Sequence, residues 1–232
     1  MIELRPFASL GAFRNEWLDS HHHFSFADYH DPKRMGWGQL RVWNDDRIKP
    51  ATGFPMHGHR DMEIITYVRS GGVTHEDNLG NRGRTPAGSV QVMHAGTGIL
   101  HGEFNEDAVD TTIFQIWIFP AEQRVAPGWQ MREFPSGSAA GKLVALASGR
   151  AGDTDALPLY QDAAMLCATL ARGGTATHGL GSGRHAYLVP ARGAVTVNGT
   201  KVNAGDGCAI VDETNLTIQA LADSELVLID CP

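Results

Sequence analysis

The sequence of 232 residues has few cysteines and no long apolar run. The cysteines are Cys167, Cys208 and Cys231. Because they are scattered and odd in number, they fit neither a disulfide framework nor a zinc site built from cysteine. The longest nearly apolar run, residues 163–171, is far below the roughly 20 residues that span a bilayer. The N-terminus carries Glu3 and Arg5 where a secretory signal needs an unbroken apolar stretch. We therefore expect a soluble cytoplasmic protein that does not bind membranes.

Positive charge is also scarce. The chain has 19 Lys and Arg residues against 26 Asp and Glu residues, which gives a formal net charge of −7. No stretch is dense in Lys or Arg. An acidic surface repels phosphate backbones, so we expect no direct binding to nucleic acid.

Helix signals are weak, whereas strand signals dominate. Short runs of β-branched and aromatic residues, such as residues 64–68 and 112–118, are separated by turns rich in glycine and asparagine. The Asn198-Gly199 pair lies between two such runs and is a strong signal for a two-residue hairpin turn. Only the neighbourhoods of residues 13–18 and 159–171 allow a helix, and the second is equally compatible with a strand. The pattern predicts an all-β sandwich or barrel.

The two halves of the chain resemble each other. YVRSGGVT at residues 67–74 is matched by YLVPARGAVT at residues 187–196, and AGS at 87–89 is matched by AGD at 204–206. The nearly constant offset suggests a duplicated β-unit, with chance similarity of short glycine turns as the alternative.

A small, turn-rich stretch at residues 134–141 is the candidate linker between the halves. We therefore expect two β-domains, one over residues 1–135 and one over residues 142–232.

Histidine is concentrated in the first half, where nine of the eleven histidines precede residue 102. We interpret the run at residues 21–23 as a polar turn before a strand at residues 24–26. The more informative histidines lie in two triplets, HGH at residues 57–59 and HGE at residues 101–103.

Both triplets have the spacing of metal ligands on strands. Side chains at positions i and i+2 of a strand project from the same face, so His57 pairs with His59, and His101 with Glu103. Two such strands that face each other across a barrel interior would place three imidazoles and one carboxylate around one point. This donor set suits a divalent transition metal and leaves positions open for a further ligand. A single histidine of this kind is usually a surface or hydrogen-bonded residue, but two such pairs favour a metal site.

The wider sequence around the triplets resembles the pirin family of bicupins. Residues 53–63 (GFPMHGHRDME) are similar to the first cupin motif, and the stretch from 87 to 103 is similar to the second. The further segments that carry the resemblance are WLDS at 17–20, FSFA at 24–27, DP at 31–32, NLGN at 78–81 and GTGILHGE at 96–103. The resemblance implies two tandem cupin (jelly-roll) β-barrels, of which only the N-terminal one has a metal site.

Residue by residue, the resemblance places the family's metal ligands on His57, His59, His101 and Glu103. It implies one divalent transition metal, Fe(II) first, with Ni, Cu, Mn or Zn as alternatives. Glu63 matches the glutamate of the common cupin motif, and we expect it to be structural or to orient a ligating histidine.

The second half departs from the ligand pattern. His178 is the one histidine that falls at a position matching a ligand. We therefore expect a second barrel without metal, in which His178 and His185 face solvent or lie satisfied in the core.

The resemblance implies a quercetin 2,3-dioxygenase, which opens the heterocycle of a flavonol with O₂ and releases carbon monoxide. The partners would be the flavonol and O₂, and we expect a monomer or a weak dimer. Glu103 would be the catalytic base that accepts the proton of the flavonol 3-hydroxyl. The candidates for an apolar cavity lining are Phe54, Met56, Ile99 and Phe114.

The alternative is a metal-containing, redox-responsive regulator that binds a transcription factor or a metabolic enzyme. A purely structural metal is a third interpretation, which the open donor set disfavours because structural sites tend to be closed.

Overall fold

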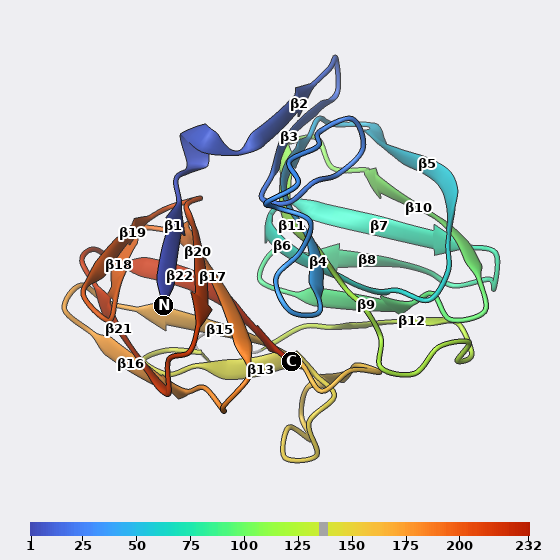
Figure 1. The fold of residues 1–232 in the computed structure, drawn as a ribbon. Coiled ribbons are helices and arrows are strands. Elements are labelled where there is room, and N and C mark those ends of the chain that lie inside the picture. Colours follow the sequence, from blue (N-terminus) through green and yellow to red (C-terminus); the bar gives the residue numbers. More distant parts are fainter. Residues whose placement is uncertain (135–138) are drawn as a thin grey trace.

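The computed structural model describes residues 1–134 and 139–232, which fold almost entirely into β-strands (Figure 1). The helical content of the described residues is the single turn η1 (Phe7–Ser9). The expected all-β class is confirmed, and neither region that allowed a helix is helical, with β15 (Ala164–Leu170) in the second. Because β15 is buried on both faces, its apolar run lacks the alternation that marks a half-exposed strand. No helix in these two ranges is long and apolar enough to span a bilayer.

The first barrel consists of a large and a small antiparallel sheet. The large sheet has the strand order β12 (Gly128–Arg132), β9 (Val90–His94), β6 (Glu63–Ser70), β11 (Thr111–Ile118), β4 (Leu40–Ile48), β3 (Leu18–His22) and β2 (Gly11–Arg14). The small sheet has the order β5 (Thr52–His59), β10 (Ile99–Asn105), β7 (Gly72–Asp77) and β8 (Arg82–Pro86).

The second barrel repeats this arrangement. Its large sheet has the order β1 (Ile2–Arg5), β20 (Gly207–Val211), β17 (His185–Arg192), β22 (Ser224–Cys231), β15, β13 (Val144–Ser148) and β14 (Leu157–Pro158). Its small sheet has the order β16 (Thr175–Gly179), β21 (Asn215–Ala220), β18 (Ala194–Val197) and β19 (Thr200–Asn203). The strands β6, β7 and β9 thus correspond to β17, β18 and β20, the segments whose sequences resemble each other.

The predicted hairpin turn joins β18 and β19. Asn198 and Gly199 have φ values of 46° and 86°, and two consecutive positive φ angles are those of the tight hairpin turn that this dipeptide favours. A local sequence signal was sufficient here because both central residues tolerate the left-handed region.

The first strand of the chain belongs to a sheet of the second barrel. Strand β1, at the N-terminus, pairs with β20 of the second barrel, with Leu4 opposite Cys208. The division into residues 1–135 and 142–232 stays a prediction, with β1 lying on the sheet of the second unit. The candidate linker at 134–141 falls largely outside the described residues, since positions 135–138 are not among them.

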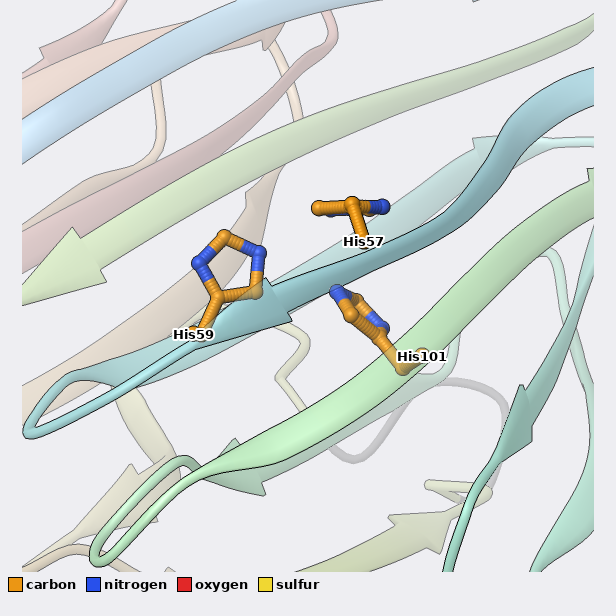
Figure 2. Close-up of side chains that lie close together, drawn as sticks. All are labelled: His57, His59 and His101. Atoms are coloured by element: carbon orange, nitrogen blue, oxygen red, sulfur yellow. The ribbon is translucent and has the colours of Figure 1, made fainter.

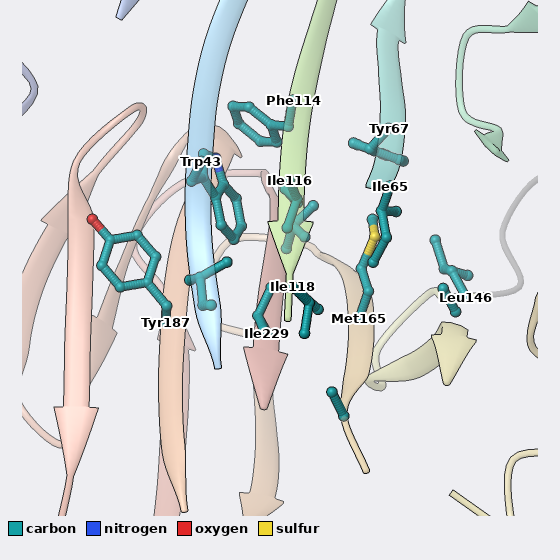
Figure 3. Close-up of a cluster of buried hydrophobic side chains, with 14 of the residues drawn as sticks. Trp43, Ile65, Tyr67, Phe114, Ile116, Ile118, Leu146, Met165, Tyr187 and Ile229 are labelled. Carbon is teal, nitrogen blue, oxygen red and sulfur yellow. The ribbon is translucent and has the colours of Figure 1, made fainter. Parts of the chain in front are cut away.

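The two barrels pack against each other through their large sheets (Figure 3). Trp43, Phe114 and Ile116 of the first barrel share one buried cluster with Tyr187 and Ile229 of the second. This packing buries the outer face of each large sheet, which explains why strands such as β6 and β11 are apolar on both faces.

The interiors of the two barrels differ in polarity. The second is filled by one continuous apolar cluster that includes Leu188, Ile218 and Leu228. The first holds two small apolar clusters, one around Ile113 and Val68 and another that includes Met93. The space between these clusters contains polar side chains and the candidate site.

Candidate metal centre

The two histidine triplets lie on neighbouring strands of one sheet. Strands β5 and β10 are antiparallel partners, and His57 is directly opposite His101 in their register. We had expected the triplets to face each other across the barrel interior, and this was wrong. The same side chains still converge, because residues directly opposite in an antiparallel pair project from the same face of the sheet.

Three imidazoles form a compact cluster (Figure 2). His57, His59 and His101 each offer a ring nitrogen, and these nitrogens lie within 4.8 Å of one another. The ring centroids of His57 and His101 are 4.5 Å apart, and those of His59 and His101 are 5.1 Å apart. Among the described residues this is the one group of three or more potential ligands.

Hydrogen bonds leave a nitrogen free on two of these rings. His57 Nδ1 lies 2.7 Å from the carbonyl oxygen of Pro55, so Nδ1–H donates and Nε2 keeps its lone pair. His101 Nδ1 contacts a neighbouring ring, whereas His101 Nε2 is buried and has no hydrogen-bond partner. A buried acceptor without a partner costs about 1–3 kcal/mol, and a metal ion would supply the missing bond. The residues therefore fit a divalent metal.

A buried chain of side chains supports His101 from behind. His101 Nδ1 is 3.4 Å from His75 Nδ1, and His75 Nε2 is 3.0 Å from Asp77 Oδ2. Asp77 in turn accepts hydrogen bonds from the backbone of Leu79 and from the backbone and side chain of Asn81. A carboxylate behind a ligating histidine fixes the tautomer and the orientation of that histidine ring. Here the carboxylate of Asp77 acts on His101 through His75. His75 lies outside both triplets, and pairing of β7 with β10 is what brings it to His101.

Burial keeps two of the three imidazoles neutral in the metal-free protein. Desolvation, followed by the charges of neighbouring histidines, lowers the pKa of His59 to about 4. The same causes lower the pKa of His101 to about 3. Because a metal binds the neutral ring, both side chains are available as ligands at neutral pH without losing a proton.

Glu103 lies on the wall of the same cavity but outside the three-histidine group. Gln91 Nε2 donates to its Oε1 and Gln115 Nε2 to its Oε2, each at 2.6 Å, and Thr66 Oγ1 donates to Oε1 at 3.0 Å. Between His101 and Glu103 the register with β5 shifts, so that Glu103 lies opposite Phe54. Its role as the fourth ligand stays a prediction.

Glu63 is structural, and it does not orient a ligand. Its Oε2 accepts hydrogen bonds from His94 Nδ1 at 2.7 Å and from the backbone N–H of Tyr160 at 3.0 Å. His94 is not in the three-histidine group, and Tyr160 belongs to the second half of the chain. The buried carboxylate therefore connects the two halves.

The histidines open into a cavity of about 210 Å³ between the two sheets of the first barrel. Phe54 lines it as expected, but the other three residues proposed for the lining do not. Met56 is half exposed, Ile99 lies in a small apolar cluster, and Phe114 lies in the core between the barrels. Side chains of neighbouring residues on a strand alternate between its faces, and the sequence alone did not fix which face is interior.

The side of the cavity formed by the large sheet is unexpectedly polar. Ser20 and His22 of β3 lie opposite Asp46 and Asn44 of β4, and all four line the cavity. We expected a polar turn at residues 21–23, but His21 and His22 end strand β3 and His23 follows it, and residues 24–26 form no strand. The interpretation failed because a polar side chain such as His22 is tolerated on a strand face that lines a cavity.

The second barrel has no such site in the part of the chain that the structure describes. His178 Nε2 is 2.6 Å from Asp230 Oδ2, and Arg184 and Arg150 bind the same carboxylate. His178 is thus satisfied by an ion-pair network, as expected for a residue outside a metal site.

Comparison with known proteins identifies relatives along the whole chain. The family model described as Pirin matches residues 4–118, and the one described as Quercetinase C-terminal cupin domain matches residues 145–231. A pirin-like protein of Caulobacter vibrioides is 58% identical over 230 residues, covering 99% of each chain. A quercetin 2,3-dioxygenase of Escherichia coli K12 is 41% identical over 234 residues, covering 100% of this chain and 99% of its own.

A solved structure supports metal binding by such a fold. The bacterial pirin YhhW of Escherichia coli in complex with nickel(II) has a TM-score of 0.91 and 41% identity, covering 100% of this chain and 99% of that one.

Proposed function

This chain belongs to the pirin family of bicupins, and from that premise we propose that it is a metal-dependent dioxygenase acting on flavonols such as quercetin. The observation that carries the proposal is the cluster of His57, His59 and His101 at the wall of a cavity within the first barrel. A donor set of this kind leaves room for an exchangeable ligand, as catalysis requires.

We propose that the three histidines and Glu103 hold one divalent transition metal. The nickel complex of YhhW and the neutral imidazoles of this chain support a divalent ion, and Fe(II) is our first candidate. Thr66, Gln91 and Gln115 keep the Glu103 carboxylate at the same cavity.

When bound, the metal supplies a Lewis acid that lowers the pKa of the flavonol 3-hydroxyl and helps to orient the ring beside O₂. Glu103 accepts the hydroxyl proton, because its carboxylate lies on the wall of the same cavity as the three histidines. Phe54 and Ile64 provide apolar contacts to the rings and exclude water from the reacting face.

The size of the cavity sets how a flavonol can bind. A volume of about 210 Å³ lies below the roughly 300–1,000 Å³ of a typical ligand pocket. A flavonol would therefore fill the cavity and extend into its mouth, where Phe13 is half exposed.

Oxygen consumption by metal-loaded protein tests the proposal. The protein is stripped with a chelator, reloaded anaerobically with Fe(II) or Ni(II), and mixed with quercetin and O₂. We expect O₂ uptake with one carbon monoxide released per flavonol consumed, and none from the stripped protein. If every loaded form leaves quercetin intact, while loading alters binding to a protein partner, the enzymatic function is refuted and the regulatory one is favoured.

A further inference from the structure

The cavity has a polar wall opposite the histidines. Strands β3 and β4 of the large sheet supply it, whereas the histidines come from β5 and β10 of the small sheet. Ser20 lies directly opposite Asp46, and His22 directly opposite Asn44. We call these four residues the acceptor wall. Each is more than nine-tenths buried in the protein.

Three atoms of the acceptor wall lack a hydrogen-bond partner. They are His22 Nδ1, Asn44 Oδ1 and Asp46 Oδ1. Among the residues the structure describes, no cation forms an ion pair with Asp46. Buried polar groups are normally satisfied, so three unsatisfied atoms on one cavity wall indicate a missing partner.

The three atoms can all accept a hydrogen bond, Asp46 Oδ1 when its carboxyl is ionised and His22 Nδ1 when Nε2 carries the ring proton. Burial lowers the pKa of His22 to about 4, so the ring is neutral at neutral pH and one of its nitrogens is an acceptor. The amide oxygen of Asn44 can accept hydrogen bonds but cannot donate them. The same holds for the carboxylate of Asp46 when it is ionised. A ligand that satisfies this wall must bring donors, and a carboxylate or phosphate ligand would be repelled.

Apolar side chains surround the wall on the remaining sides of the cavity. Phe13, Leu18, Phe26 and Phe54 line it, and the rings of His22 and Phe26 meet edge to face with centroids 5.2 Å apart. The two other unpartnered lining atoms lie at the histidine end, on His101 and on Trp117, whose ring is 4.9 Å from that of His59. The cavity thus combines an aromatic slot, a metal-binding end and an end that accepts hydrogen bonds.

We propose that the acceptor wall is a binding subsite for hydroxyl groups on an aromatic ring, and that it selects polyhydroxylated aromatic substrates. This inference rests on the proposed function, because it assumes that the substrate's enol binds at the histidine end. It adds that hydroxyls on the distal ring donate to Asp46, Asn44 and His22.

The expected selectivity follows from the cost of leaving acceptors unpaired. A site built to hydrogen-bond a substrate hydroxyl rejects an analogue without it, since the analogue buries the acceptor without a partner. One hydrogen bond to a charged group corresponds to roughly a tenfold change in affinity. We therefore expect flavonols with two adjacent hydroxyls on the distal ring to bind at least about tenfold more tightly than flavonols with none.

Equilibrium binding without turnover tests the subsite. Nickel-loaded protein is titrated anaerobically at pH 8 with flavonols that carry two, one or no distal hydroxyls. The variants are Asp46→Asn, which removes the charge at nearly constant volume, and His22→Phe, which keeps the packing on Phe26. Asp110→Asn is the matched control, because Asp110 is half exposed and does not line this cavity.

In the wild type and in Asp110→Asn we expect the tenfold preference for the dihydroxylated flavonol. In Asp46→Asn and His22→Phe this preference should shrink severalfold, because the flavonol with two distal hydroxyls loses affinity while the flavonol without them does not, and the nickel content should stay unchanged. Equal affinities across the series in the wild type would overturn the subsite, and the proposed function would survive if the flavonols were still oxidised.

A second arm separates the subsite from the metal site. Metal-free protein is titrated with 1,2-dihydroxybenzene and 1,2-dimethoxybenzene, which differ in their ability to donate hydrogen bonds. We expect binding of the first only, and its loss in Asp46→Asn. If no flavonol binds the loaded protein but this difference persists, the proposed function fails and the subsite stands. If neither compound is distinguished, the subsite is wrong.

Discussion

The Nδ1 atoms of His75 and His101 lie 3.4 Å apart in the interior of the first barrel, and one proton arrangement satisfies both rings. If His75 Nε2–H donates to Asp77, His75 Nδ1 is an acceptor, so that His101 Nδ1–H must donate to it. The remaining nitrogen, His101 Nε2, then carries a lone pair that is directed away from His75 and Asp77. The contact therefore prepares His101 for a metal before any metal binds.

Replacing His75 should weaken metal binding without abolishing the fold. His75→Phe keeps a flat ring to stack on Trp129, whose ring lies 4.8 Å away, but removes the acceptor for His101. Loss of such an outer contact typically weakens metal affinity by about 10–100-fold. Calorimetric titration of the stripped variant with Ni(II) measures this. Wild-type affinity in a folded His75→Phe protein would show that the contact does not position His101.

Removal of a proposed ligand should have a larger effect on metal content. His59→Ala or His101→Ala should reduce the metal from about one equivalent per chain to a small fraction, because each deletes one of the four proposed bonds. Elemental analysis after gel filtration measures the content. His178→Ala is the control, since this residue binds Asp230 in the second barrel. Comparable metal loss in the control would contradict the assignment of the site to the first barrel.

Metal retention should persist to a lower pH than free imidazole would allow. An unperturbed histidine has a pKa near 6.5, so protons compete with a metal for its ring nitrogen below about that pH. Burial holds the pKa of His59 at about 4 and that of His101 at about 3, so protons compete with the metal at these rings only well below pH 6. We expect little metal loss between pH 7.5 and about 5.5, measured by dialysis and elemental analysis. Loss of half of the metal by pH 6.5 would refute this.

The buried carboxyl of Asp46 should destabilise the metal-free, ligand-free protein at high pH. Burial raises its pKa from 3.8 to about 7, so the folded state holds this proton more tightly than the unfolded state does. With a raised pKa, the cost of ionisation is absent at low pH and grows as the pH rises from about 4 to about 7.

Asp46→Asn should therefore be more stable than the wild type at pH 8, by roughly 2–4 kcal/mol, at about 1.4 kcal/mol per pKa unit. At pH 4 the two proteins should differ little. Urea unfolding at both pH values checks this, with Asp110→Asn as the control. A variant less stable than the wild type at pH 8 would show that a cation or another partner pairs with Asp46.

Glu103→Gln should separate metal binding from catalysis. The amide retains one oxygen but removes the charge and the basicity, and it sets an NH₂ group against a donor of Gln91 or Gln115. We expect measurable metal content with oxygenation of flavonols reduced by at least about 10²-fold, as for loss of a general base. The comparison is Glu63→Gln, which affects a hydrogen bond to His94 outside the cavity. Wild-type turnover by fully metallated Glu103→Gln would remove this residue from the mechanism.

The local features of this protein follow from its amino-acid sequence alone. The hairpin at Asn198-Gly199 and the short strands followed from turn chemistry and side-chain periodicity, which act over a few residues. The common face of His57 and His59 was also evident, because the i, i+2 spacing within a strand fixes it. The wider resemblance supplied the two barrels, which the comparisons confirm.

The surroundings of those histidines depend on how the strands pair in the folded chain. Strand pairing joins residues far apart in the chain, and no local pattern specifies which strand becomes the neighbour of which. Pairing of β10 with β5 and β7 brought His101 beside both His57 and His75, and pairing of β3 with β4 opposed His22 to Asn44. A buried polar residue such as Asp46 reads in the sequence as a surface residue, since burial is set by the opposite sheet and not by the strand that carries it.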